Sequence, residues 1–406
     1  MKKIKPELLA GAGNWSSLIS AVNAGANSVY FGVKGLNMRN LADNFDPLEL
    51  KKVMNFLHQN NKKGYLAVNV IVMNNELTKL EKILTKAKAA KVDAVILWDM
   101  AVFSLAKEIG LTIHLSTQAS VANIKALAYF VSLGVKRVVL ARECSLSDIT
   151  RMIEFCDQQN VQCEIESFIH GAMCVSVSGR CFLSSLSFFK SANRGECIQP
   201  CRREFIIKDK EDEVEYQIGK DYILSPKDLC SIDFIDQLID AGIHCFKIEG
   251  RKRSSEYVKV VTSVYRQAID AFFANQLTQE LKQDFKQQLK TVYNRGFSSG
   301  FYFGKPENAI SRKLEHTHEK VYLGQVNKFY KKISVAEVFI HQGKIKKNDQ
   351  LLIVGKKTPA SVFVVDQLQH NHCFVEEVGK GHAVGVKLPF VAKPKDKVFH
   401  WIKNNC

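Results

Sequence analysis

The 406-residue chain contains no apolar run that approaches the roughly 18 residues needed to span a bilayer. Its first residues, MKKIKPELLAGAGNW, are basic and then apolar, but the apolar part is too short for a secretion signal and leads directly into a strand pattern. We therefore expect a cytoplasmic protein without a membrane partner. In a reducing cytoplasm, 11 cysteines indicate metal binding or catalysis rather than a disulfide framework.

The chain also lacks several short motifs of well-known enzyme classes. It contains no HExxH, the zinc-binding helix of many metalloproteases. The AGAGN sequence near the start lacks the complete glycine fingerprint of a dinucleotide site, and we interpret it as a tight turn after a strand. No internal repeat and no low-complexity tail is present.

Positive charge is in excess, with 57 lysines and arginines against 41 acidic residues and a formal net charge of +16. Two explanations are open. A lysine-rich composition would simply solvate the surface, whereas a polyanionic partner would use the charge for binding. Among such partners we place nucleic acid ahead of membrane, because no basic amphipathic helix stands out.

Residues 1–295 alternate short apolar runs with amphipathic stretches. For example, the helix pattern DPLELKKVMNFLHQNN is followed by the strand pattern YLAVNVIV. Repeated strand–helix units with nearly continuous apolar strands predict a parallel sheet covered by helices. Their number favours an α/β fold with a closed (β/α)8 TIM-like barrel over an open doubly wound sheet.

The rest of the chain has a different character. Residues 296–318 begin with the glycine- and aromatic-rich stretch GFSSGFYFGKP, and we interpret them as a linker or a lid. Between residues 319 and 406, strand patterns such as DQLLIVG and SVFVVDQLQ follow one another at turn-length spacing. We predict a small C-terminal all-β barrel there, with possible contact to RNA.

Polar side chains stand where the apolar runs of the predicted barrel stop. The catalytic mouth of an α/β barrel lies at the carboxyl ends of its strands. One polar residue at a strand end means little, but a ring of them indicates an enzyme-like pocket. The ring comprises Asn69, Asn74, Asp99, Thr117, Gln118, Arg142, Glu143, His170, Glu249 and Arg251.

The segment GAMCVSVSGRCFLSSLSFFKSANRGECIQPCRR (171–203) holds four cysteines separated by six, fifteen and three residues. Structural zinc sites usually pair cysteines about two to four residues apart, twice over, and only the last pair here fits. Iron–sulfur clusters tolerate irregular spacing, so we place such a cluster ahead of zinc. The candidate ligands are Cys174, Cys181, Cys197 and Cys201, with Cys230 as an alternative fourth ligand.

The stretch ESFIHGAMCVSVSGRCFLSS resembles the signature of peptidase family U32, the collagenase-like peptidases. The stretches NRGECIQPCR, YILSPKDLC and FKIEGRKRSSEYVKVVTSVYRQAID are also similar to blocks of that family. The resemblance spans residues 7 to about 275, and the C-terminal part resembles the family's small β-barrel extension. The signature is met by Glu166, Phe168, Gly171, Ala172, Cys174, Gly179, Cys181 and Ser184.

The resemblance implies one of two groups of proteins. A few members are described as collagen-degrading, whereas a larger set are hydroxylation proteins that carry a 4Fe–4S cluster and act on tRNA, ribosomal RNA or the ubiquinone ring. The RNA-directed members are associated with prephenate as the source of the hydroxyl group. By position, Cys174, Cys181 and Cys197 match cluster ligands, and the tRNA-type members favour Cys201 over Cys230 as the fourth.

A chain of this length with a single C-terminal barrel is most similar to the tRNA group, which makes 5-hydroxyuridine at the wobble position. The resemblance therefore implies tRNA and prephenate as partners. Some relatives work as pairs of paralogues, so a paralogue or a second copy is a further candidate partner. Two alternatives remain open: a U32-type peptidase, and either an enzyme for another RNA or a non-enzymatic RNA-binding factor.

The hydroxylation hypothesis assigns roles to strand-end residues. Arg142, Lys247 and Arg251 are candidates to hold the two carboxylates of a prephenate-like acid, because arginine grips carboxylates through two hydrogen bonds. Glu166 and Glu249 are candidates for general acid–base catalysis, and His170 is a further candidate catalytic residue. The candidates for phosphate contact are Arg194, Arg202, Arg203, Lys252 and Arg253. The candidates for stacking on a displaced base are Tyr30 and Phe301.

Overall fold

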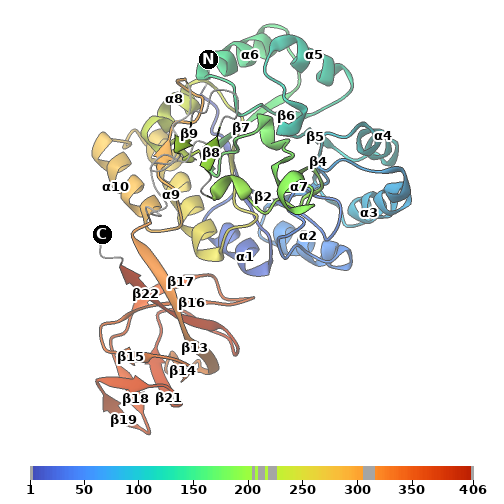
Figure 1. Ribbon diagram of the computed structural model, residues 1–406. Helices are drawn as coiled ribbons and strands as arrows, with labels where there is room; N and C mark the ends of the chain where they lie inside the picture. The colour runs from blue at the N-terminus through green and yellow to red at the C-terminus, as the bar shows by residue number, and fades with distance from the viewer. Residues whose placement is uncertain (1–2, 204–205, 209–214, 218–225, 305–315, 404–406) are drawn as a thin grey trace.

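The computed structural model describes residues 3–203, 206–208, 215–217, 226–304 and 316–403. Within these ranges, eight parallel strands form a closed barrel (Figure 1). The eighth strand in the ring pairs with both the seventh and the first, so the predicted TIM-like barrel is confirmed. In order around the ring, the strands are β1 (Glu7–Gly11), β2 (Ser28–Phe31), β3 (Lys63–Ala67), β4 (Ala94–Leu97), β5 (Ile113–Leu115), β6 (Arg137–Val139), β7 (Glu164–Gly171) and β11 (Cys245–Ile248).

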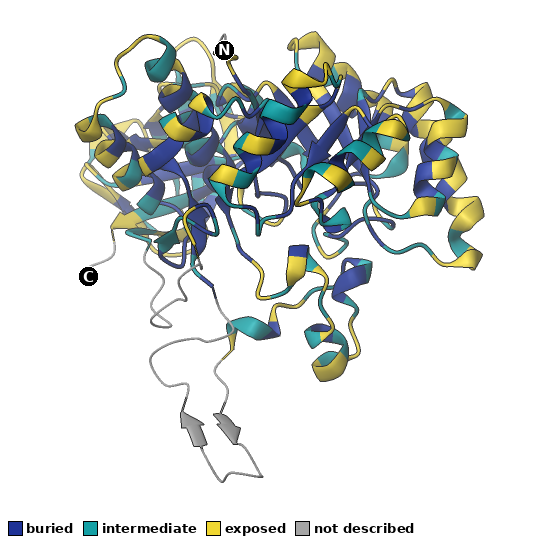
Figure 2. Cartoon of the chain, turned by 90° about the horizontal axis from the view of Figure 1, so that it is seen from above, coloured by how far each residue is buried: buried dark blue, intermediate teal, exposed yellow. Residues whose placement is uncertain are grey.

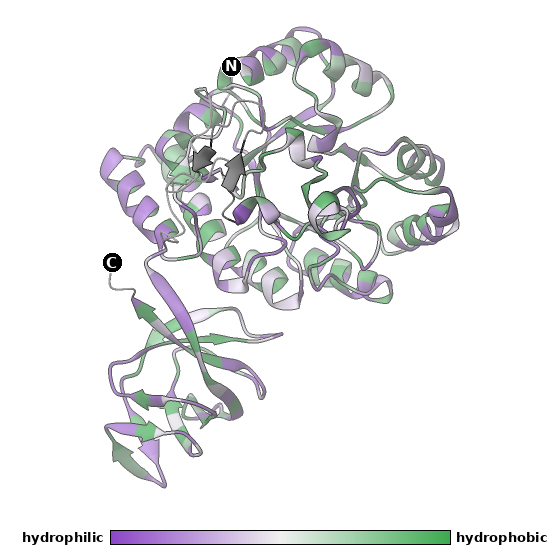
Figure 3. Cartoon of the chain, in the orientation of Figure 1, coloured by the Kyte–Doolittle hydropathy of each residue, from purple (hydrophilic) through white to green (hydrophobic). Residues whose placement is uncertain are grey.

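Helices surround the barrel and pack their apolar faces against its strands, and most of them present a polar or charged face outward. Several begin at a side-chain cap, as where Asp99 accepts hydrogen bonds from the N–H groups of Ala101 and Val102. The helices are α1 (Trp15–Asn23), α2 (Leu50–Gln59), α3 (Leu77–Ala89), α4 (Met100–Ile109), α5 (Ile124–Ser132), α6 (Leu146–Gln158), α8 (Ile235–Asp240), α9 (Ser255–Phe273) and α10 (Gln279–Lys290). Figure 3 shows α10 as hydrophilic along most of its length, as expected for an outer helix.

The main core lies between the strands and the helices, and a second, smaller core fills the barrel itself. In Figure 2 the barrel strands are coloured as buried, with exposed residues on the outer helices. The interior cluster is built from residues that point inward from neighbouring strands. Its members are Leu9, Tyr30, Tyr65, Ala94, Ile96 and Cys245.

The segment between β7 and β11 replaces the simple helical crossover found elsewhere in the ring. It contains the four clustered cysteines and consists mainly of short helical turns. They are η4 (Val177–Gly179), α7 (Leu183–Phe188), η5 (Ala192–Arg194) and η6 (Pro200–Arg202). Two small strands, β8 (Ile206–Lys208) and β9 (Glu215–Gln217), form a hairpin after them. Then β10 (Asp228–Cys230) pairs antiparallel with the end of β7, and β12 (Phe297–Ser298) pairs with β10.

The C-terminal region has its own antiparallel sheet and its own apolar core. The two edge strands of this sheet do not pair with each other in the described chain, so the sheet forms a half-barrel. The predicted C-terminal all-β domain is therefore confirmed. In sheet order the strands are β17 (Ser361–Val364), β16 (Gln350–Val354), β22 (Lys397–Lys403), β13 (His318–Tyr330), β14 (Val335–Ile340), β21 (Ala383–Lys387), β18 (Leu368–His370) and β19 (Cys373–Val375). A separate pair consists of β15 (Lys344–Lys346) and β20 (Glu377–Gly379).

The two domains meet at α1 and α9. The N–H group of Ala360 donates to Ser20 on α1 at 3.4 Å, and Lys259 on α9 donates to the carbonyl of Ala360 at 2.7 Å. Most of the predicted linker, residues 305–315, lies outside the described residues. Among the helices that are described, none is long and apolar enough to cross a membrane.

Candidate functional site

A pocket opens at the carboxyl ends of the barrel strands, where the sequence predicts a catalytic mouth. Its free space is about 1210 Å³ when the open mouth is included. The predicted strand-end residues that line it are Asn69, Thr117, Gln118, Arg142, Glu249 and Arg251. Lys247 also lines the pocket, so the barrel brings together side chains from the ends of four different strands, β3, β5, β6 and β11.

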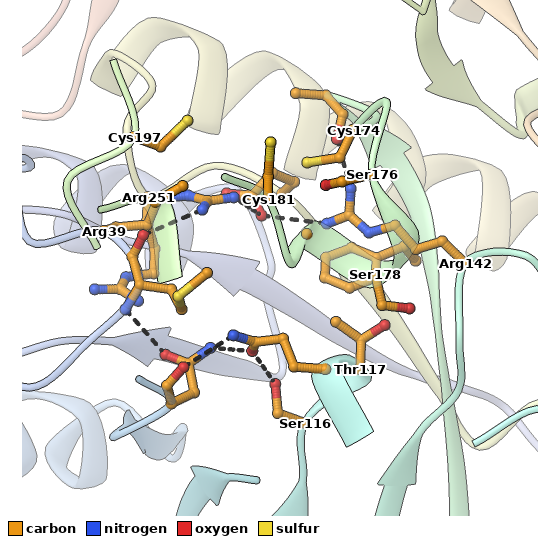
Figure 4. Close-up of a pocket in the computed structure, with 18 of the residues that line it drawn as sticks. Arg39, Ser116, Thr117, Arg142, Cys174, Ser176, Ser178, Cys181, Cys197 and Arg251 are labelled. Carbon is orange, nitrogen blue, oxygen red and sulfur yellow. Dashed lines mark hydrogen bonds and ion pairs between the residues drawn. The ribbon is translucent and has the colours of Figure 1, made fainter. Parts of the chain in front are cut away.

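All four clustered cysteines line this pocket. Figure 4 shows the sulfur atoms of Cys174, Cys181 and Cys197 at one side of it. Cys174 is exposed, and Cys181, Cys197 and Cys201 are half-buried. The N–H group of Leu183 donates to Cys181 Sγ at 3.3 Å, a bond that stabilises negative charge on this sulfur.

The cysteine segment is held against the loop after β2. Gly195 has a φ of +85°, and a Cβ atom at this position would lie 2.1 Å from the carbonyl oxygen of Asn37. Only glycine fits this left-handed backbone and this close approach. The contact therefore sets the position of Cys197, two residues further along.

The arrangement of donors distinguishes between the two predicted metal sites. Among the described residues, no three His, Cys, Asp or Glu side chains come together as a site for a single metal ion. A zinc ion with four bonds of about 2.3 Å would need its sulfurs about 3.8 Å apart. A 4Fe–4S cluster is held by four thiolates that are more widely separated, and the four cysteines around this pocket provide that number of ligands.

Cys230 lies away from the other four cysteines. It is 4 % exposed, and the hydroxyl of Tyr265 donates to its sulfur at 3.7 Å. Burial raises the pKa of the Cys230 thiol to about 11. Cys230 does not line the pocket and Cys201 does, so of the two candidates only Cys201 shares the pocket with Cys174, Cys181 and Cys197.

Positive charge converges on one carboxylate in the same pocket. Arg39 and Arg142 donate to the same oxygen of Glu249, Oε2, at 3.1 Å and 3.4 Å. Burial alone would raise the pKa of Glu249, but the charges of Arg39, Arg142 and Arg251 outweigh it and lower the pKa to about 2. Three guanidinium groups around one carboxylate leave a net positive charge, which suits an anionic ligand.

Arg251 is enclosed by polar side chains of the loop after β2. Its Nη2 donates to Oδ1 of Asn44 at 2.9 Å and to Oδ1 of Asn37. A Cβ atom on Gly32 would lie 2.2 Å from this same nitrogen, so the absence of a side chain there makes room for the guanidinium. Arg251 is 3 % exposed, and burial lowers its pKa to about 10. Its Nε is buried without an acceptor in the described structure, as expected where a ligand completes a site.

Glu166 lies inside the barrel rather than in the pocket. It is fully buried, and Lys247 Nζ lies 2.6 Å from its Oε1, while Arg137 Nη1 lies 3.2 Å from its Oε2. Lys247 reaches the pocket above, with its ammonium 4.5 Å from the centre of the Tyr30 ring. Glu166 therefore positions Lys247 and compensates its charge.

His170 does not line the pocket either. It is 2 % exposed and packs against the rings of Tyr257, Tyr265 and Phe297 at 5.5–6.0 Å. Burial, with a smaller contribution from the charge of Arg253, lowers the pKa of His170 to about 3. A neutral, enclosed imidazole cannot exchange protons with a ligand in the pocket, so His170 is left out of the site proposed below.

The other predicted contacts are placed as follows. Arg194 is engaged in an ion pair with Glu76 at 2.5 Å, and Lys252 donates to the carbonyl of Cys197 at 3.2 Å. Arg203 lies 4.4 Å from the centre of the Phe188 ring. Tyr30 and Arg202 line the pocket, and Phe301 lines a neighbouring smaller cavity. Arg253 lies against the ring of Tyr293.

Sequence reasoning missed Arg39, which approaches Glu249 more closely than either predicted arginine. Arg39 lies in the sequence GVKGLNMRNLADN, a loop that follows β2. The available signal was an arginine in an asparagine-rich loop that follows a predicted strand. Two asparagines of the same loop, Asn37 and Asn44, were also missed.

Comparison with known proteins provides independent information. The sequence model that describes peptidase family U32 matches residues 13–312 of this chain. The chain is 42% identical to "Uncharacterized protease MJ0090" of Methanocaldococcus jannaschii, over 97% of this chain and 97% of the relative. It is 36% identical to a "Collagenase" of Porphyromonas gingivalis, over 98% of this chain and 98% of the relative. It is also 36% identical to "tRNA hydroxylation protein P1" of Bacillus subtilis, over 78% of this chain and 76% of the relative.

Proposed function

The chain belongs to peptidase family U32, and from this premise we propose that it is an RNA-hydroxylating enzyme that converts wobble uridine of tRNA to 5-hydroxyuridine. In this proposal a 4Fe–4S cluster is the cofactor and prephenate, a dicarboxylate, is the hydroxyl donor. The relative named as a tRNA hydroxylation protein supports the choice of RNA as the substrate.

The convergence of Arg39, Arg142 and Arg251 beside the four cysteines carries the proposal. Arginine binds carboxylates through two parallel hydrogen bonds, and one internal carboxylate, Glu249, leaves part of this capacity for a ligand. A small acid with two carboxylates therefore fits the pocket by charge. Lys247 adds a further cation, although its interaction with Glu166 already balances part of its charge.

In this proposal, the residues of the chain have the following roles. Cys174, Cys181, Cys197 and Cys201 would hold the cluster, which supplies redox or Lewis-acid chemistry when bound. The three arginines would orient the carboxylates of the acid. Glu249 keeps Arg39 and Arg142 in place, because its lowered pKa keeps it ionised throughout the physiological range.

A peptidase is the second candidate, favoured by the names of the two relatives that match nearly the whole chain. The sequence GFSSG at 296–300 also fits the Gly-x-Ser-x-Gly pattern of serine hydrolases. However, Ser298 lies in the short strand β12, whereas that pattern requires a sharp turn from a strand into a helix. No histidine is among the described residues that line the pocket, and His170 is enclosed and neutral, so no nucleophile–histidine pair is present in the pocket.

The deciding experiment is mass spectrometry of nucleosides from bulk tRNA, comparing wild-type cells with a strain that lacks this gene. We expect loss of 5-hydroxyuridine and its derivatives, restored by the wild-type gene but not by Arg142→Ala protein that retains its iron. An unchanged profile in the deletion strain contradicts the proposal, and assays on ribosomal RNA and on gelatin then follow. Full restoration by Arg142→Ala instead favours a non-enzymatic RNA-binding factor.

A further inference from the structure

The segment that carries the cysteines also exposes large apolar side chains. Phe182, Leu186 and Phe189 are 71 %, 80 % and 96 % exposed. Single exposed apolar residues are common on protein surfaces, but these three lie close together, because Leu186 is in α7 and Phe182 and Phe189 flank its two ends. We call this surface the α7 face, defined by Phe182, Leu186 and Phe189.

Phe189 has an unusual backbone conformation. It ends α7 with φ 55° and ψ 28°, a left-handed conformation that usually belongs to glycine or asparagine at a helix end. A bulky residue in this conformation is strained, and burial of the ring does not compensate, since the ring is almost completely exposed. Such strain is often retained where an exposed side chain has a function.

Positive charge surrounds the α7 face. The segment 171–203 contains four arginines and one lysine against a single acidic residue, Glu196. Arg180, Lys190 and Arg203 are exposed, and in the described chain none of them has a carboxylate partner. A surface that combines exposed aromatic rings with unpaired cations is complementary to a ligand that has both planar rings and negative charge.

The α7 face is directly linked to the candidate site. Leu183, in the first turn of α7, donates its N–H to Cys181, which lines the pocket. In Figure 2 the short helices of this segment stand at one end of the barrel, with exposed residues on their outer side. A ligand on the α7 face would therefore lie beside the pocket mouth.

We propose that the α7 face binds an unpaired loop of RNA, with bases stacked on Phe182 and Phe189 and phosphates next to Arg180, Lys190 and Arg203. This inference rests on the proposed function and adds a binding surface for the unpaired loop that carries the target uridine. Bases in a duplex are already stacked and hidden, whereas the bases of a loop can turn outward onto aromatic side chains. A protein partner would need its own acidic surface to match these cations, whereas RNA carries phosphates and planar bases along its whole length.

The test measures RNA binding separately from hydroxylation. The probes are a fluorescein-labelled RNA stem–loop with a uridine-containing loop and a blunt RNA duplex of the same stem sequence, in fluorescence anisotropy with the cluster-loaded full-length chain. Phe182→Ala and Phe189→Ala are each expected to weaken stem–loop binding about tenfold and to leave duplex binding unchanged. Phe374→Ala is the matched control, since Phe374 is 74 % exposed but lies on β19 of the C-terminal domain.

A second measurement tests the role of the cations. Lys190→Ala is expected to reduce the slope of log affinity against log salt by about 0.7, the value for one phosphate contact on a single strand. The phenylalanine variants are expected to keep the wild-type slope, because stacking releases no counterions.

Two outcomes overturn the inference: equal stem–loop affinity in wild type and both phenylalanine variants, or a change of oligomeric state in these variants with RNA affinity unchanged. The second result would identify a second copy of the chain as the occupant. Failure of the proposed function is a separate result. In that case the wild-type protein would bind the stem–loop through Phe182 and Phe189, but the deletion strain would keep its 5-hydroxyuridine.

Discussion

Arg39 Nη2 lies 3.1 Å from Oε2 of Glu249, although 210 positions separate the two residues in the sequence. Arg39 belongs to the loop after β2, and Glu249 directly follows β11. The strand order β11–β1–β2 brings these two strand ends to the same part of the barrel mouth. The contact therefore depends on barrel closure, and it organises the positive charge of the pocket.

Replacement of Arg39 tests the proposed acid-binding site. We expect Arg39→Gln to weaken prephenate binding by about tenfold or more, because one bidentate partner for a carboxylate is lost. The measurement is isothermal titration calorimetry on the iron-loaded protein. Arg151→Gln, a change at an exposed position of α6, is the matched control. Equal affinities for wild type and both variants would show that the arginine cluster serves another purpose.

The placement of cysteines predicts which thiols are needed for a cluster. We expect Cys201→Ser to lose most of its iron, sulfide and broad visible absorbance after anaerobic reconstitution. Cys230→Ser is expected to retain them, because Cys230 is buried against Tyr265 outside the pocket. Cys373→Ser controls for the loss of an exposed thiol in the C-terminal domain. The opposite pattern for Cys201 and Cys230 would reverse the assignment of the fourth ligand.

Glu166 is expected to be essential for stability. Glu166→Gln removes the carboxylate charge that pairs with buried Lys247 and one of three carboxylates that pair with Arg137, so we expect a loss of about 3–5 kcal/mol in the free energy of unfolding. Urea denaturation followed by circular dichroism measures this loss. Glu81→Gln, at an exposed position of α3, should change stability by less than about 0.5 kcal/mol. A small effect of Glu166→Gln would mean that water or a shifted side chain compensates the two cations.

His170 predicts a dependence of stability on pH. Its pKa is about 3 in the folded chain and near 6.5 in the unfolded chain, so below pH 6.5 only the unfolded chain takes up the proton. The free energy of unfolding should therefore fall as the pH falls from 6.5 towards 3, by about 2 kcal/mol at pH 5 from this residue alone. We expect His170→Leu to remove this part of the pH dependence.

The comparison is made by urea denaturation of wild type and variant at pH 7 and pH 5. His372→Leu, at an exposed position of the C-terminal domain, is the control and should keep the wild-type pH dependence. If His170→Leu loses as much stability as wild type between these two pH values, His170 is protonated in the folded chain and its enclosure by aromatic rings is incomplete.

Several features of this protein could be derived from the sequence because they depend on local patterns. The alternation of apolar strand runs with amphipathic helices predicted the closed barrel, and the change to short strand patterns near residue 319 predicted the β domain. The clustering of four cysteines within one segment predicted that they lie together, and all four line the pocket. Polar residues at strand ends identified Arg142, Glu249 and Arg251 as pocket residues, since all parallel strands of a barrel present their carboxyl ends at one face.

Only the tertiary structure decided which of these side chains meet and which are enclosed. Glu166 and His170 also lie on β7, but they point to a buried ion-pair network and to an aromatic cluster, respectively. The direction of a side chain depends on how β7 twists and on what packs against it, which local sequence does not record. Arg39 and Cys201 reach the pocket through loops whose paths are set by distant contacts, such as that of Gly195 with Asn37. Periodicity describes neighbours along the chain, whereas a site is made by neighbours in space.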